Sequence, residues 1–318
     1  MNDEPHTIDS HRASTLVASG AASLRLGEMQ TFMNLSIIPV FPQSDDGPLY
    51  GPLSEALREG SLTVGEISES GSVPVLNVKN SGSADVLVID GEELEGAKQN
   101  RALNSTVLIG AGEQTLIPVS CTERGRWAYR TRGFHDSEEV LSHQIRKKKM
   151  ASVSKSLKAS HGFASAQGEV WQEIDELHSS LSTHSSTAAM KDAYTARTRE
   201  IGEYARAFSL VDGQTGVLVF LNGRISSLET VSSPRAFAQL HEKIVRSHAI
   251  AALARPQTTS SFPDASEAEL LLRRMGTCEA TAHKSPGRGH DLRFNGAGLE
   301  GSALCVDDAL VHTLVYAQ

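Results

Sequence analysis

Short apolar runs separated by turn-forming residues dominate the first 120 residues of the chain. Strands are predicted where these runs alternate with polar residues or are continuously apolar, at 32–41, 62–67, 73–78, 86–89 and 103–109. Residues 53–57 instead fit one or two helical turns that stop at Gly60. The runs 106–109 and 115–119 flank Gly110-Ala111-Gly112-Glu113, and this arrangement predicts a β-hairpin.

The middle of the chain has the longer period of helices. Apolar residues recur every three or four positions over 170–181 and again over 190–208, which predicts amphipathic helices. A hairpin follows at 217–228, where Asn222-Gly223 supplies a tight turn, and Ser233-Pro234 opens another helix. A short helix and three closing strands complete the predicted elements.

This order predicts the fold class α+β, with an antiparallel β-rich N-terminal half, a helical middle and a C-terminal part of the form β-β-α plus β. The β-rich half fits either a sandwich or an open barrel. Residues 1–22 are polar and show no clear period, so we expect a flexible arm. A β-rich lobe over 23–135 and a helical and mixed α/β lobe over 136–318 should pack together as one composite unit.

Charge and cysteine content limit the cellular compartments and the classes of partner that the sequence is compatible with. The 318 residues carry a formal net charge of −8, which argues against a broad nucleic-acid-binding surface. The three cysteines are widely spaced and form no CxxC pair, so neither a disulfide framework nor a structural zinc site is expected. The sequence shows no apolar run of membrane-spanning length and no signal peptide. We therefore expect a cytoplasmic protein that has no membrane partner.

The densest polar stretch lies at 91–101 and reads GEELEGAKQNR. It lies between two predicted strands, at 86–89 and 103–109. Buried charges need partners, and an ordinary surface turn rarely combines carboxylates, amides and both kinds of cation. Two interpretations follow: a binding or catalytic site, and an internal salt-bridged network that braces a loop.

As a site, this stretch offers several kinds of chemistry. Lys98 and Arg101 could hold an anionic ligand, while Gln99 and Asn100 could read a ribose or a base edge. Glu93 could act as a general base, with Lys98 as the second catalytic group that stabilises negative charge. A divalent cation bound by the glutamates of 92–95 is an alternative, because a metal site made only of oxygen ligands is difficult to detect from sequence. No residue is assigned as a metal ligand, and the cofactor stays unknown.

A second polar group follows at 121–127. Cys121 lies near two arginines whose charges could lower the thiol pKa and make it a nucleophile; the alternative is a small buried residue at a strand end. Arg126 and Trp127 could form a ligand platform for a base or a ribose. Trp127 could equally be an anchor in the core.

Other charged segments are typical of ordinary structure. The basic run Arg146-Lys147-Lys148-Lys149 fits a solvated helix face or linker, with docking of a phosphate-rich partner as the alternative. The twelve histidines show no HxxxH spacing, and the HxxE pair of His135 and Glu138 has no second pair beside it. The sequence contains no Walker A, GxSxG or HExxH motif.

Three blocks in the same order resemble one prokaryotic family: GEELEGAKQNR at 91–101, IPVSCTERGRW at 117–127 and SSTAAMKDAY at 185–194. This is the ARG and Rhodanese-Phosphatase-superfamily-associated Protein domain family. Residues 255–290 match least well, so the resemblance implies a variable insert there. The family name implies work near ADP-ribose or nucleotide metabolism, with an ADP-ribosylglycohydrolase-type or phosphatase-type protein as a candidate partner.

Two functions fit these expectations. In the first, the polar site binds a nucleotide-like or ADP-ribose-like small molecule, and catalysis would be hydrolysis or transfer at a phosphate or ribosyl centre. In the second, a non-catalytic interaction or scaffold module works with separate ADP-ribose- or phosphate-processing enzymes. The polar stretch suits both, so the sequence leaves open whether the protein is an enzyme.

Overall fold

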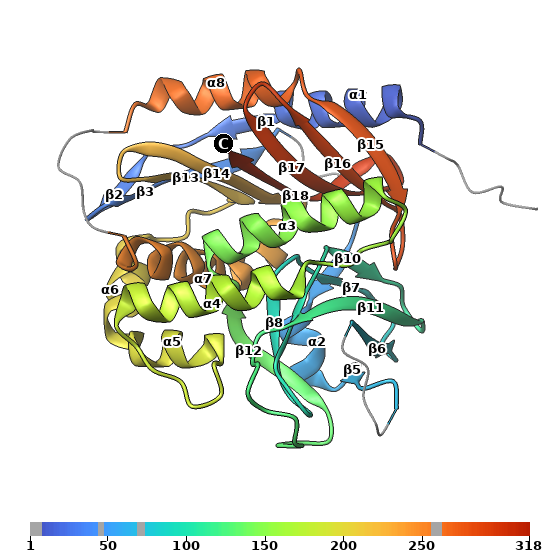
Figure 1. Ribbon diagram of the computed structural model, residues 1–318. Coiled ribbons are helices and arrows are strands. Elements are labelled where there is room, and N and C mark those ends of the chain that lie inside the picture. Colours follow the sequence, from blue (N-terminus) through green and yellow to red (C-terminus); the bar gives the residue numbers. More distant parts are fainter. Residues whose placement is uncertain (1–7, 44–47, 69–73, 256–262) are drawn as a thin grey trace, which may run out of the picture.

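The chain forms three β-sheets and eight helices within the residues that the computed structural model describes, 8–43, 48–68, 74–255 and 263–318 (Figure 1). The predicted fold class, mixed α+β, is confirmed. No helix in these ranges is both long and apolar enough to cross a membrane. The helices are α1 Ser10–Ala22, α2 Leu53–Glu59, α3 His143–Lys158, α4 Gln167–Leu181, α5 Met190–Ala196, α6 Thr198–Ala207, α7 Pro234–Leu253 and α8 Ala265–Met275.

The nine-stranded sheet combines strands from both halves of the chain. Its order is β1-β3-β13-β14-β18-β17-β16-β15, with β2 beside β3, and its pairings are antiparallel. Because β3 pairs with β13, the segments 23–135 and 136–318 share one sheet. The strands are β1 Leu24–Leu26, β2 Gln30–Phe32, β3 Leu35–Pro42, β13 Gly216–Leu221, β14 Arg224–Val231, β15 Glu279–Lys284, β16 His290–Gly296, β17 Leu299–Val306 and β18 Ala309–Ala317.

Helices cover both faces of this sheet (Figure 1). Ile38 and Phe220 belong to the apolar cluster formed with α1 and α8, whereas Ile37 and Val219 belong to the cluster formed with α7. This alternation follows from the two-residue period of a strand. The clusters on the two faces form the main core of the protein.

The six-stranded sheet curls into a half-barrel in the N-terminal half of the chain. Its order is β12-β8-β9-β11-β6-β5, and its end strands β12 and β5 approach each other. Leu76, Val78, Leu94 and Val119 contribute to its apolar interior. A three-stranded sheet of order β10-β7-β4, with a parallel β4–β7 pair, packs on the same cluster. The strands are β4 Tyr50–Pro52, β5 Leu62–Gly65, β6 Val75–Asn80, β7 Asp85–Val88, β8 Glu92–Gly96, β9 Arg101–Leu103, β10 Val107–Ile109, β11 Gln114–Cys121 and β12 Phe134–Val140.

The expectation of a flexible arm over 1–22 is wrong for residues 10–22, which form α1. Asp9 caps this helix by accepting a hydrogen bond from the Arg12 amide at 2.8 Å. Ala13 and Val17 lie one helical turn apart and are buried against the large sheet. The apolar face is built largely from alanine, and a stripe of such small side chains is hard to distinguish in a polar sequence. Residues 1–7 lie outside the described residues.

The predicted hairpin across 110–113 is also wrong. The turn itself forms, with the Glu113 amide donating to the Gly110 carbonyl oxygen at 3.1 Å. However, β10 pairs with β7, whereas β11 pairs with β6 and β9 in the other sheet. The continuously apolar run of β10 is buried in full and pairs with the apolar residues Val86–Val88 of β7. Strands β10 and β11 therefore diverge into different sheets after the turn.

Two tight turns of the C-terminal half agree with the sequence. Asn222 and Gly223 have φ angles of 51° and 72° and connect β13 to β14, which confirms the predicted hairpin. Asp307 and Asp308 likewise adopt positive φ between β17 and β18. Ser233 caps α7, and Pro234 occupies its first turn.

The stretch 255–290 contains integral parts of the fold. Helix α8 covers one face of the large sheet, and β15 is its edge strand. Residues 256–262 of this stretch lie outside the described residues. An insert variable in sequence would therefore still contribute to the core through α8 and β15.

Candidate functional site

The polar stretch 91–101 contains β8, the connection from β8 to β9 and the first residue of β9. Gly96 has a φ angle of 128°, and a Cβ atom there would lie 2.6 Å from the Gly133 carbonyl oxygen. Glycine is therefore required at this position. The residues after it, Ala97 to Asn100, carry the chain across to β9.

Strand register separates the predicted site residues onto two faces. Leu94 pairs with Arg101, which pairs with Cys121, whereas Glu93 pairs with Ala102. Because successive residues point to opposite faces, Arg101 and Cys121 share the half-barrel interior with Leu94, and Glu93 points away from it. Arg101 and Glu93 thus do not converge on one site.

Arg101 is fully buried, and only one side of its guanidinium is engaged. Nη1 donates to Gln99 Oε1 at 2.7 Å and to the Cys121 sulfur at 3.0 Å. Nε and Nη2 are buried without a hydrogen-bond partner among the described residues. These two donors form an edge that can bind a carboxylate or a phosphate in bidentate fashion. A buried donor without an acceptor costs about 1–3 kcal/mol, so this edge would gain strongly from an acceptor on a ligand.

Glu66, which directly follows β5, is the anionic group nearest to that edge. Its carboxylate is 4% exposed, and Oε1 lies 3.9 Å from Arg101 Nη2, too far for a hydrogen bond. Neither carboxylate oxygen has a hydrogen-bond partner within the described residues. Glu66 therefore offsets the charge of Arg101 but accepts no hydrogen bond from it. A hydroxyl group or water molecule between them could satisfy both.

Two aromatic side chains and Lys98 form the solvent-facing rim next to Arg101. Arg101 Cζ lies 5.6 Å from the centroid of the Trp127 ring. Lys98 Nζ lies 5.4 Å from the Trp127 ring and 5.2 Å from the Tyr129 ring. Trp127 is 47% exposed and Tyr129 is 49% exposed, so Trp127 is a surface residue rather than an anchor in the core. Aromatic faces of this kind can stack with a base, and cations beside them attract phosphate.

Arg126 supports the connection that carries Lys98 and Arg101. Its Nη1 donates to the carbonyl oxygen of Ala97 at 2.7 Å, and its Nη2 donates to Asn100 Oδ1 at 3.0 Å. Its Nε donates to Glu123 at 2.8 Å. Burial raises the pKa of Glu123, but hydrogen bonds from Arg126 and Thr187 outweigh this effect and hold it below its ordinary value. A ligand contact through Arg126 or Asn100 would compete with these internal bonds.

Glu93 lies on the other face, in contact with the residues that lead out of β11. The Thr122 hydroxyl donates to Glu93 Oε1 at 2.5 Å, and Oε2 has no partner in the described part of the chain. Burial raises the pKa of Glu93 to about 7, and Thr122 and Lys191 offset only part of this increase. A carboxyl group with such a pKa can exchange protons near neutral pH. It would do so on the side of Lys191, not on the side of Arg101.

The raised pKa of Glu93 gives a test of its burial. A carboxyl group that is harder to ionise in the native state destabilises the fold as pH rises from about 4.5 to 7. Below this range both states are protonated, so the penalty vanishes. Glu93→Gln should therefore become more stable relative to the wild type by about 2–3 kcal/mol between pH 4 and pH 8. Urea unfolding at both pH values measures this difference, and a pH-independent difference would contradict it.

Cys121 is enclosed by Arg101 and by Gln167 of α4. The Cys121 amide donates to Gln167 Oε1 at 2.8 Å, and Gln167 Nε2 donates back to the Cys121 carbonyl oxygen at 2.9 Å. Burial raises the pKa of the thiol above its ordinary value, although Arg101 acts in the opposite direction. The thiol is thus protonated at neutral pH, whereas nucleophilic attack requires the thiolate.

Glu92 takes part in a purely internal network. Its Oε2 accepts a hydrogen bond from the Ile89 amide at 2.9 Å, and its Oε1 contacts Lys243 Nζ of α7 at 3.0 Å. Lys243 also donates to Asp136 of β12 at 2.7 Å. The stretch 91–101 therefore combines both interpretations of the sequence: Glu92 braces the fold through Lys243, whereas Arg101 keeps two donors without an acceptor among the described residues.

The basic run 146–149 is not a solvated face as a whole, and for Arg146 and Lys149 that prediction is wrong. Arg146 donates to both carboxylate oxygens of Glu229 at 2.6 Å and to Asp90 at 3.0 Å. Lys149 donates to the other oxygen of Asp90 at 2.8 Å. Helix α3 thus connects the large sheet to the end of β7, and positions 146 and 149 share its inward face. His312 completes the network at 2.9 Å from Glu229.

A family model for the ARG and Rhodanese-Phosphatase-superfamily-associated Protein domain, ARPP-1, matches residues 23–316. The chain belongs to the ARPP-1 family. No curated protein and no solved structure matches the chain. The ARPP-1 match includes Arg101 and the residues described around it, which are Glu66, Lys98, Gln99, Cys121, Trp127 and Tyr129. Among the described elements, only α1 lies outside the matched range.

Sequence reasoning about this ARPP-1 domain missed Glu66 and Tyr129. Glu66 lies within the strand predicted at 62–67. Its distance of 35 positions from Arg101 concealed the pairing. Tyr129 lies two residues after Trp127, and its exposed ring gave no signal of its own.

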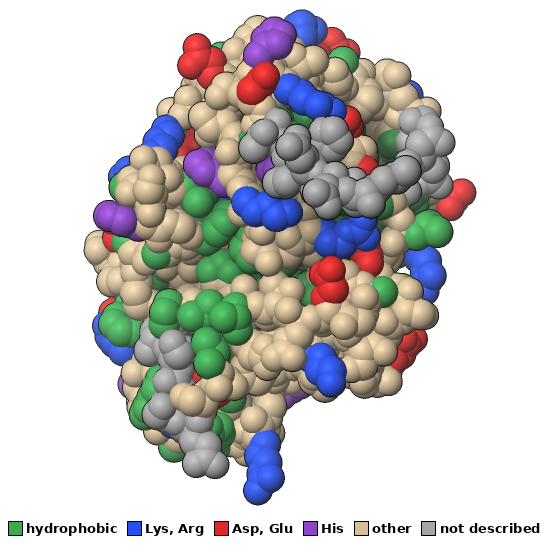
Figure 2. All heavy atoms as spheres, turned by 90° about the vertical axis from the view of Figure 1, so that its right-hand side faces the viewer, with side chains coloured by type: hydrophobic (Ala, Val, Ile, Leu, Met, Phe, Trp, Pro, Cys, Tyr) green, Lys and Arg blue, Asp and Glu red, His purple; other side chains and the backbone are tan. Residues whose placement is uncertain are grey.

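Two further properties of the ARPP-1 domain bear on its ligands. In the described ranges, no three His, Cys, Asp or Glu side chains gather as a metal site would require. On the face drawn in Figure 2, Lys and Arg side chains lie among Asp and Glu side chains and form no continuous basic area over the described residues. Lys98 and Arg101 place two positive charges beside the Trp127 ring.

Proposed function

We propose that this ARPP-1 domain binds a small anionic ligand of the nucleotide or ADP-ribose class at the Arg101 site. The proposal rests on one observation above all: the Nε and Nη2 edge of Arg101 is buried without an acceptor next to an exposed tryptophan. The Arg101 site comprises Glu66, Lys98, Gln99, Arg101, Trp127 and Tyr129.

Each part of such a ligand has a matching group. A phosphate would replace the distant Glu66 as the partner of Arg101 and would be attracted further by Lys98. A base would stack on the exposed ring of Trp127 or Tyr129. Glu66 would accept a hydrogen bond from a ribose hydroxyl. Because Trp127 packs against Arg101, ligand entry requires its side chain to move aside.

Binding, rather than turnover, is the function that the geometry supports best. Glu93 and Lys149, whose pKa values burial shifts to about 7 and about 8, both lie outside the Arg101 site. If the ligand is also converted, hydrolysis or group transfer at a phosphate or ribosyl centre is the class that Arg101 and Lys98 would assist, by stabilising negative charge.

A thermal-shift screen of the purified protein with ADP-ribose, NAD, ADP and inorganic phosphate tests this proposal. A ligand that binds only the native state stabilises it by about 2.7 kcal/mol at a hundredfold excess over Kd. We expect a clear shift with ADP-ribose or ADP that is larger than the shift with inorganic phosphate. No shift with any of them would favour the scaffold function instead.

Lys98→Ala should weaken binding of the ligand found in that screen by about 5- to 20-fold, as expected for a partly exposed phosphate-binding lysine. Its melting temperature should remain close to that of the wild type. The matched control is Lys155→Ala, which removes an exposed lysine from α3 without touching the Arg101 site. Equal affinities of the two variants in calorimetric titrations would exclude Lys98 from the site.

A further inference from the structure

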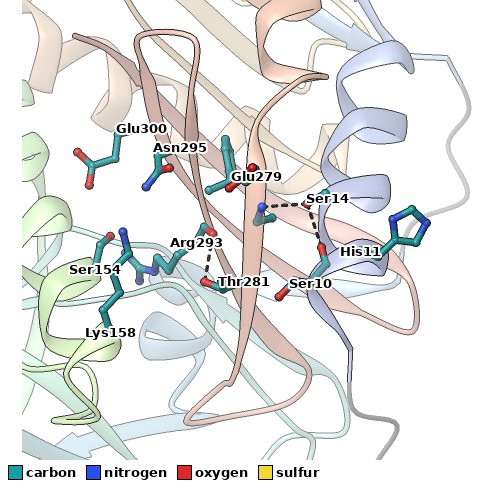
Figure 3. Close-up of a pocket in the computed structure, with 12 residues that line it drawn as sticks. Ser10, His11, Ser14, Ser154, Lys158, Glu279, Thr281, Arg293, Asn295 and Glu300 are labelled. Carbon is teal, nitrogen blue, oxygen red and sulfur yellow. Dashed lines mark hydrogen bonds between the residues drawn. The ribbon is translucent and has the colours of Figure 1, made fainter.

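A cavity of about 400 Å³ lies over the edge of the large sheet (Figure 3). It is formed by the N-terminal part of α1, the C-terminal part of α3 and strands β15 to β17. It shares no lining residue with the Arg101 site. Its charged lining groups are Lys158, Glu279, Arg293 and Glu300, and Ser154 and Asn295 add polar groups beside them.

Arg293 of β16 is the most constrained charged group of this cavity. Its side chain is only 3% exposed, and its Nε and Nη2 pair with the Asp291 carboxylate at 2.5 and 2.9 Å. This bidentate contact fixes the guanidinium and leaves Nη1 on the opposite edge. Nη1 is buried and has no hydrogen-bond partner among the described residues. Figure 3 shows the Arg293 side chain extending from its strand toward Ser154 and Lys158 of α3.

Lys158 adds a second positive charge at the same end. It lies in the last turn of α3, is exposed, and enters no ion pair within the described ranges. Asp291 neutralises the charge of Arg293. The charge of Lys158 is therefore the net positive charge at this end of the cavity. An oxyanion placed between Arg293 Nη1 and Lys158 would gain charge-assisted hydrogen bonds from both.

The other end of the cavity has the opposite character. Asn295 and Glu300 line it and are drawn in Figure 3 on the far side of Arg293 from Thr281. Glu279 pairs with Asn295 across the strands and adds a second carboxylate to this end. Glu300 also acts on the charge of Lys147 of α3, so one of the two carboxylates is offset by a cation. The remaining negative charge attracts an ammonium group and repels an anionic group. The cavity is therefore bipolar: it has a cationic end at Arg293 and Lys158, and an anionic end at Glu300.

We propose that this cavity is a second ligand site, for a small zwitterion with a carboxylate or phosphate at one end and an ammonium group at the other. The oxyanion contacts Arg293 Nη1 and Lys158, and the ammonium group contacts Glu300 and Asn295. This site is independent of the Arg101 site, because no side chain is common to both.

Calorimetric titrations at low salt test the site with 4-aminobutyrate and phosphoethanolamine, which are zwitterions, and with succinate and inorganic phosphate, which lack the ammonium group. We expect at least one zwitterion to bind more tightly than both simple anions. Comparison of the two zwitterions then identifies the preferred oxyanion. If no compound binds, or if the simple anions bind as tightly, the proposal is wrong.

Lys158→Ala should weaken zwitterion binding about tenfold, while Lys155→Ala on the exposed surface of the same helix leaves it unchanged. The paired substitution Arg293→Met with Asp291→Asn removes both buried charges together and should abolish binding without leaving an unpaired charge. Binding that survives in Lys158→Ala and in the paired variant would overturn the assignment. Neither variant alters the Arg101 site, so a failure here is separate from a failure there.

Discussion

Removal of the Arg101 charge is expected to lower the affinity for a nucleotide-like ligand about 100-fold. Arg101→Met alone would leave Glu66 buried beside an apolar group, and a loss of stability would then obscure the loss of binding. The double variant Arg101→Met with Glu66→Gln removes both charges and should remain folded. Two charge-assisted hydrogen bonds of about 1.5–3 kcal/mol each are lost, and each 1.4 kcal/mol corresponds to a tenfold change in Kd.

Glu66→Gln alone provides the matching control. It keeps Arg101 and removes the carboxylate that competes with an anionic ligand, so affinity should rise severalfold. Titration calorimetry of the three proteins distinguishes the two effects. A folded double variant that binds with the wild-type Kd would show that Arg101 does not hold the ligand.

Loss of Arg146 is expected to have the largest effect on stability. Arg146→Met would leave Glu229 and Asp90 buried without their main partner, since only Lys149 and His312 remain in contact with them. Breaking a buried ion pair in this way costs about 3–5 kcal/mol. Burial alone would lower the pKa of Arg146, but its pairing with Glu229 and Asp90 outweighs that effect and raises the pKa, so the charge persists at all practical pH values.

Urea unfolding of Arg146→Met and of Lys155→Met measures this cost within one helix. Lys155 is exposed, and its substitution should change the free energy of unfolding by less than about 0.5 kcal/mol. Equal stabilities of the two variants would mean that the Arg146 network does not connect the sheets. An intact ligand affinity in Arg146→Met would separate this structural role from the Arg101 site.

Local sequence signals identified the parts of the fold that depend on neighbouring residues. The Asn222-Gly223 turn is one case, because positive φ at both residues is a local requirement. The polar stretch 91–101 is another, because its charge density is visible in the sequence itself. Helix α1 was not predicted from the sequence, because small residues such as Ala13 form an apolar face only when a sheet packs against them.

Properties that depend on strand register or distant partners could not be derived in this way. Glu93 and Arg101 appear as one constellation in sequence, but their register positions place them on opposite faces of the half-barrel. Arg146 and Lys149 belong to a run of four basic residues, and their acidic partners Asp90 and Glu229 lie more than 50 positions away. A basic run therefore predicts a solvated face unless those partners are known.

The fluorescence of Trp127 offers the most direct test of the Arg101 site. The chain contains two tryptophans, so the substitution Trp171→Phe leaves Trp127 as the sole indole reporter. Trp127 packs against both Arg101 and Lys98, and a ligand that stacks on it or displaces it must change its emission. Titration of this variant with ADP-ribose and ADP should give a saturable change that disappears in the Arg101→Met, Glu66→Gln background. Emission that stays constant at ligand concentrations up to the millimolar range would contradict binding at this site.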